Sequence, residues 1–81
     1  MSNQQTLRQC FQSALGLKAT EALEDLSYGA SPVWDSVAHA ALVVELESTF
    51  AVELTPEDIL QITNFQKARG VLGQKGVSFN V

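Results

Sequence analysis

A segment near the middle of the chain is apolar at every position but one. It runs from Val37 to Val44, and His39 is the exception. This density of apolar side chains exceeds what an amphipathic helix with one buried face requires. A domain of 81 residues buries only about 60% of the surface that its unfolded chain exposes, so it cannot enclose a helix on all sides. We therefore expect one small core and a surplus apolar helix face with some other use.

The composition predicts one domain, residues 1–81, without a disulfide framework. The sequence contains a single cysteine and a single histidine, which argues against internal disulfides, a cysteine-based zinc site and a histidine-rich metal site. No run of 18 apolar residues occurs, and the N-terminal residues lack the pattern of a signal peptide. We expect a soluble, cytoplasmic monomer with no membrane span and no metal site. Cys10 lies in an apolar helical stripe, so we expect it to be a core residue.

The charge distribution is uneven. All nine acidic residues lie between Glu21 and Asp58, and the five Lys and Arg residues all lie outside this span. A nucleic-acid-binding protein needs a basic face, so this pattern argues against nucleic acid as a partner. An acidic middle favours proteins that carry a basic patch. The alternative is that the charge only keeps a small domain in solution.

Capping signals divide the chain into four helices. Ser2 with Gln5 resembles a capping box, and Gly16 is a typical helix end. A second helix is expected from Asp35 or Ser36 to about Phe50. Further starts are expected at Thr55, followed by Pro56, and at Thr63, which forms a capping pattern with Gln66.

A long connection separates the first two helices. Residues 17–35 exceed the usual loop length, and a short helical turn at Ala22, Leu23 and Leu26 is expected to hold them to the core. The tail from about residue 76 is expected to be mobile. The predicted fold is all-α, a small four-helix bundle with a long loop between helices one and two.

A helical wheel divides the second helix into two apolar sides. The expected inner side contains Val43, Leu46 and Phe50, flanked by His39 and Ala40. The expected outer side contains Val37, Ala38, Ala41 and Val44, near Asp35, Glu45, Glu47 and Glu53. Two interpretations remain open: the outer side is a docking surface for a partner, or the loop 17–35 folds over it.

Ser36 at the start of this helix has several possible roles. It is a poor candidate nucleophile, because no G-x-S-x-G turn surrounds it and no acid is placed to orient His39. The free N–H groups and the dipole at a helix start favour an attached phosphate. A serine there is a suitable anchor for a phosphodiester.

The residues of this region resemble the acyl carrier protein family, whose signature is Asp-Ser-Leu at the start of the second of four helices. The similarity covers about residues 35–72 and rests on Asp35-Ser36-Val37, Leu42, Leu46-Glu47, Phe50, Glu53-Leu54, Ile62-Thr63 and Gln66. It implies that a separate phosphopantetheinyl transferase attaches 4′-phosphopantetheine from coenzyme A to Ser36. The thiol of this arm would carry an acyl group as a thioester. Asp35 would help to position the metal and substrate of the transferase.

The resemblance also implies partner enzymes that load and transfer the acyl group in fatty acid, polyketide or related specialised biosynthesis. The expected partner-binding residues are Val37, Ala41, Val44, Glu47, Glu53 and Leu54. Val37 replaces the usual leucine, and Ala38, Ala41 and Ser48 stand where the family often has acids. These departures favour a stand-alone carrier with dedicated partners in a specialised pathway.

Three alternatives remain. The first is a peptidyl or aminoacyl carrier of a nonribosomal pathway. Such carriers usually have Gly-Gly before the modified serine, where this chain has Val33-Trp34. A helical adaptor would use the apolar face without an arm. An enzyme would depend on the Ser36–His39 pair, and we expect no catalytic residue in this chain.

Overall fold

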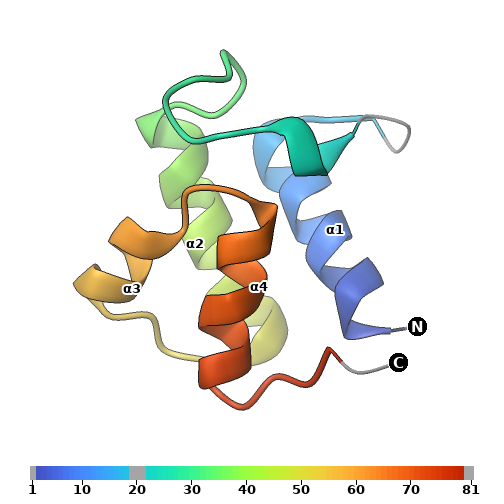
Figure 1. Cartoon of the computed structure of the whole chain (residues 1–81), viewed down its shortest axis with the longest axis vertical. Helices are drawn as coiled ribbons and strands as arrows, with labels where there is room; N and C mark the ends of the chain where they lie inside the picture. Colours follow the sequence, from blue (N-terminus) through green and yellow to red (C-terminus); the bar gives the residue numbers. More distant parts are fainter. Residues whose placement is uncertain (1, 19–21, 80–81) are drawn as a thin grey trace.

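The computed structural model describes residues 2–18 and 22–79, and every regular element within them is helical (Figure 1). The elements in chain order are α1 (Asn3–Leu15), the short 3-10 turn η1 (Leu23–Asp25), α2 (Ser36–Phe50), α3 (Pro56–Gln61) and α4 (Phe65–Gln74). Helix α1 packs along α2, α3 packs on α4, and η1 contacts α4. The prediction of an all-helical chain with four α-helices is confirmed for the described residues.

Local capping explains where α1 begins and ends and where α3 begins. The Ser2 hydroxyl accepts a hydrogen bond from the Gln5 N–H at 3.2 Å, and α1 ends at Gly16 with φ of 68°. At the start of α3, the Thr55 hydroxyl accepts from the Asp58 N–H at 3.1 Å, and the Asp58 carboxylate accepts from the Thr55 N–H at 3.0 Å. Both starts, and the Gly16 end, agree with the sequence signals.

The start of α4 differs from the prediction by one residue. Asn64 is the N-cap, and its side chain accepts from the Lys67 N–H at 2.8 Å. Thr63 instead belongs to the turn after α3, because its N–H donates to the Gln61 carbonyl and its own carbonyl accepts from the Tyr28 N–H. The expected capping box of Thr63 with Gln66 is therefore wrong.

The long connection is held to the core at several points. Leu23 in η1 is fully buried, Leu26 is half-buried, and Arg8 of α1 forms an ion pair with Glu24 at 2.6 Å. Trp34, just before α2, is also fully buried. The expected helical turn is thus present, while residues 19–21 of the connection lie outside the described residues.

The tail returns to the bundle. The Asn3 side chain donates to the Ser78 carbonyl at 2.8 Å, and the Phe79 ring lies 6.3 Å from the Phe50 ring. Val77 and Phe79 are packed on the core. The tail was expected to be mobile from about residue 76, yet its residues up to 79 make specific contacts; residues 80 and 81 lie outside the described residues.

The core is assembled around aromatic side chains. The Phe11 ring of α1 meets Trp34 and Phe65 edge-on, each at a centroid distance of 5.3 Å. Helix α2 contributes His39, Leu42, Val43 and Leu46. Of the predicted inner side, Val43 and Leu46 are buried, Phe50 is only half-buried, and Ala40 is exposed. The buried face of α2 is rotated slightly from the inner side that the helical wheel predicted. Helix α2 packs mainly along α1.

Leu46 should contribute strongly to stability, whereas Val44 should not. Leu46 is fully buried and Val44 is 65% exposed on the same helix. Leu46→Ala is expected to lower the free energy of unfolding by about 2–5 kcal/mol. The matched change Val44→Ala is expected to stay within about 0.5 kcal/mol of wild type. Urea unfolding followed by circular dichroism measures both, and equal midpoints for the two variants would contradict this assignment of the faces.

Asp58 should make the free energy of unfolding decrease as the pH becomes acidic. Its ion pair with Lys75 at 2.6 Å, together with hydrogen bonds from Thr55, holds the pKa of Asp58 below its ordinary value. The ionised carboxylate therefore stabilises the folded chain above the ordinary pKa of aspartate, about 4, and this contribution is lost as pH falls through the lowered value. Asp58→Asn should flatten the loss of stability between neutral pH and about pH 3, while Glu57→Gln should not. Unfolding free energies measured along that pH series test this, and parallel curves for wild type and Asp58→Asn would contradict it.

Candidate functional site

Ser36 occupies the first position of α2. Asp35 is the N-cap, and its Oδ1 accepts a hydrogen bond from the Ala38 N–H at 2.9 Å. Both Asp35 and Ser36 are exposed. Within the part of the chain that the structure describes, the Ser36 hydroxyl has no hydrogen-bond partner, and the N–H groups of Ser36 and Val37 are also unbonded. The site therefore presents an accessible hydroxyl beside the positive end of a helix dipole.

The segment before Ser36 is tightly folded. In the loop formed by residues 27–34, the Ser31 hydroxyl accepts from the Ser27 N–H at 3.1 Å, and the Gly29 N–H donates to the Trp34 carbonyl at 3.0 Å. The Tyr28 N–H donates to the Thr63 carbonyl at 2.9 Å, which joins the loop to the turn between α3 and α4. These bonds fix the direction from which the chain enters α2.

His39 faces inward from the first turns of α2. Its Nδ1 lies 3.0 Å from the Trp34 indole nitrogen, and its Nε2 lies 3.0 Å from the Ile59 carbonyl oxygen. The ring is 8% exposed and lies 4.5 Å from the Tyr28 ring. Both nitrogens have partners other than Ser36, so the Ser36–His39 pair considered as a dyad is not formed. Sequence reasoning missed this bridge, because its partners Trp34 and Ile59 lie outside the helix that carries His39.

The outer face of α2, defined here as Val37, Ala41 and Val44, is open to solvent. Val37 is 78% and Val44 is 65% exposed, and Ala41 is also exposed. A shallow hollow of about 510 Å³ lies on this side, lined by Ala40, Ala41, Val44, Glu45 and Ser48. The described part of the loop 17–35 does not cover the outer face, whereas Ala38 at its shoulder is half-buried.

The remaining predicted partner-binding residues do not all lie on the surface. Leu54 is 7% exposed and belongs to the core, so its assignment to the partner surface is wrong. Glu47 is half-buried, and its Oε2 accepts from the Leu54 N–H at 3.0 Å, which stabilises the turn between α2 and α3. Glu53 is exposed and forms no ion pair among the described residues. Of the two glutamates, Glu53 is the one whose charge faces solvent without a structural bond.

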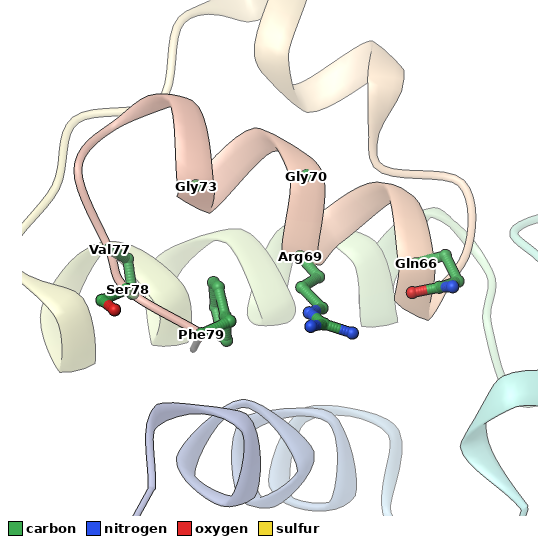
Figure 2. A pocket seen from close by; sticks show the side chains of 7 residues that line it. All are labelled: Gln66, Arg69, Gly70, Gly73, Val77, Ser78 and Phe79. Atoms are coloured by element: carbon green, nitrogen blue, oxygen red, sulfur yellow. The ribbon is translucent and has the colours of Figure 1, made fainter. Parts of the chain in front are cut away.

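A second hollow lies along α4 and the tail that follows it. It has a volume of about 400 Å³ and is lined by Gln66, Arg69, Gly70, Gly73, Val77, Ser78 and Phe79. Figure 2 shows the side chains of Arg69 and Phe79 extending to the same side of α4, and the guanidinium carbon lies 5.7 Å from the ring centroid. Phe79 contacts Phe50 at the last turn of α2, about 21 Å from Ser36 at a rise of 1.5 Å per residue. None of its lining residues belongs to α2 or to the loop 27–34, so the second hollow is separate from the Ser36 site.

Other reactive groups give no additional site. Cys10 is 4% exposed, and burial raises the pKa of its thiol, so it behaves as a core residue. No group of three or more His, Cys, Asp or Glu side chains suited to a metal ion occurs in residues 2–18 and 22–79. Among the helices described, none has the length and apolar character needed to cross a membrane.

Comparisons of the chain with protein-family models, with curated proteins and with solved structures find no match. The geometry around Ser36 and the residue pattern of α2 are therefore the grounds on which a function is assigned.

Proposed function

We propose that this chain is an acyl carrier protein in which Ser36 bears a 4′-phosphopantetheine arm. The observation that carries the proposal is the exposed Ser36 hydroxyl, which has no partner among the described residues and stands at the first position of the 15-residue helix α2. The Asp35-Ser36-Val37 pattern and its helix order resemble the acyl carrier family. The arm would supply a thiol that holds an acyl group as a thioester.

The residues around Ser36 suit a phosphodiester. The attached group would carry a negative charge next to the free N–H groups of Ser36 and Val37, where the helix dipole is worth about 0.3–1 kcal/mol. Asp35 already uses one carboxylate oxygen for the Ala38 N–H. Its other oxygen remains available to a transferase and its metal ion, in line with the role that the resemblance implies for it.

The outer face of α2 suits the docking of partner enzymes. Val37, Ala41 and Val44 offer apolar contact area, and the exposed carboxylates of Asp35 and Glu53 lie before and after α2 in the chain. The transferase and the enzymes that load and transfer the acyl group would bind to this surface. Because few acidic side chains lie on the face itself, a carrier of a specialised pathway fits better than a general fatty acid carrier. A helical adaptor is the second candidate, since the outer face and its hollow do not depend on Ser36.

Ser36 should be the sole modified residue. After incubation with coenzyme A and a phosphopantetheinyl transferase, intact mass should show one added phosphopantetheine on wild type and none on Ser36→Ala. The helix should persist in the variant, because Asp35 rather than Ser36 provides the cap. Ser48→Ala, an exposed serine of the same helix, should be modified to completion. An arm found on Ser36→Ala would overturn the assignment, and a wild type that gains no mass would favour the adaptor.

Substitution of an apolar residue and substitution of a charged residue should affect partner binding differently. Exposed charge attraction is screened over about 8 Å at physiological ionic strength, whereas apolar contact is not. Val44→Asp should weaken transferase binding at low and high salt alike. Glu53→Lys should mainly slow association at low salt, with the difference shrinking as salt rises. Glu53 is the better test residue than Glu47, whose bond to Leu54 would be lost as well. Association rates at several salt concentrations measure this, and a silent Val44→Asp would remove the outer face as a docking surface.

A further inference from the structure

Three separate elements meet at the His39 side chain. Trp34 belongs to the loop 27–34, His39 to α2, and Ile59 to α3, and two hydrogen bonds of 3.0 Å join them in a row. We call this arrangement the His39 bridge. It lies one turn from Ser36, because the His39 N–H donates to the Asp35 carbonyl in the first turn of the helix.

The geometry assigns one tautomer to His39. An indole N–H can only donate, so Nδ1 of His39 must accept the bond from Trp34. Nε2 therefore carries the proton and donates it to the Ile59 carbonyl oxygen. The bridge has a fixed direction, from Trp34 through His39 to Ile59, and no other tautomer satisfies both ends.

Helix α3 depends on such polar ties more than the other α-helices do. It has six residues, none of them fully buried, and Leu60 is 78% exposed. The Ile59 side chain packs on the core, and two polar contacts add to it: the ion pair of Asp58 with Lys75, the C-cap of α4, and the bond of the Ile59 carbonyl with His39 of α2. The loop 27–34 is likewise tied by Tyr28 to Thr63 and by Trp34 to His39.

We propose that His39 is a positioning residue for the modification of Ser36: its bridge fixes the loop 27–34 and α3 on either side of the start of α2, and the transferase recognises that arrangement. The inference rests on the proposed function of Ser36. His39 does not touch the reacting atoms, because both of its ring nitrogens are engaged inside the fold. Its effect should fall on recognition of the carrier and not on the chemical step.

The test compares His39→Leu with His39→Gln as substrates of the transferase and coenzyme A. Leucine fills the space but makes neither of the two bonds, so KM for the carrier should rise about tenfold or more, with kcat nearly unchanged. The glutamine amide can accept and donate, so His39→Gln should recover most of the wild-type KM. Leu46→Ala is the matched control, since it destabilises the same helix without touching the bridge, and it should keep the wild-type KM at a temperature where it is folded.

Nuclear magnetic resonance gives a readout that does not depend on modification. The chain has one tryptophan and one histidine, so each side chain gives a single set of signals. The wild-type imidazole nitrogens should report the Nε2–H tautomer, and exchange of the Trp34 indole proton should be slow. His39→Leu should speed this exchange and that of the amides around Ile62.

The possible results separate the two proposals. A wild type that is modified together with a folded His39→Leu of unchanged KM overturns the His39 inference alone. An Nδ1–H tautomer in the wild type also overturns it. A wild type that gains no arm overturns both the function and the positioning role. If His39→Leu does not fold, Trp34→Phe, which removes the loop end of the bridge and keeps a smaller aromatic ring in the core, should raise KM, and an unchanged KM there overturns the inference.

Discussion

Burial of Trp34 is the interaction on which the arrangement of this chain depends. The residue ends a long connection that has little regular structure, and its side chain is fully buried against Phe11 of α1 and bonded to His39 of α2. A buried tryptophan removes about 150–250 Å² from water, worth about 4–6 kcal/mol at 25 cal/mol per Å². This is comparable with the whole stability of a small domain, about 5–15 kcal/mol. One loop residue thus links α1, α2 and the connection through a single buried side chain.

The helices were predictable because their ends are decided within a few residues. Ser2, Gly16 and the Thr55–Asp58 pair act on backbone groups three or four positions away, and the sequence contains both partners of each bond. The start of α4 was missed for a different reason. Thr63 and Asn64 are both good caps, and the choice between them depends on Tyr28, which bonds the Thr63 carbonyl from a distant loop.

The candidate site likewise contains features that the sequence predicts and features that only the tertiary fold explains. Helical periodicity placed Val37 and Val44 on the side of α2 away from the core, and only the structure shows that the described part of the loop leaves them exposed. Periodicity gives the angle of a side chain around a helix but not what it meets there, so it could not show that His39 bonds Trp34 and Ile59. Leu54, which the resemblance alone placed among the partner-binding residues, lies beyond the end of α2, where helical periodicity gives no information about burial. The one polar residue in the apolar segment is explained only by partners that the tertiary fold brings to it.

The Asn3–Ser78 hydrogen bond brings the two ends of the described chain together. They meet near Phe79 and Phe50, at the opposite end of α2 from Ser36 (Figure 1). A group attached at either of these two ends would therefore lie at nearly the same place on the molecule. A linker, a tag or a surface attached at either end would hold the molecule with Ser36 directed away from the anchor, by about the 21 Å length of α2. The fold thus separates the point by which the molecule is held from the point at which Ser36 is reached.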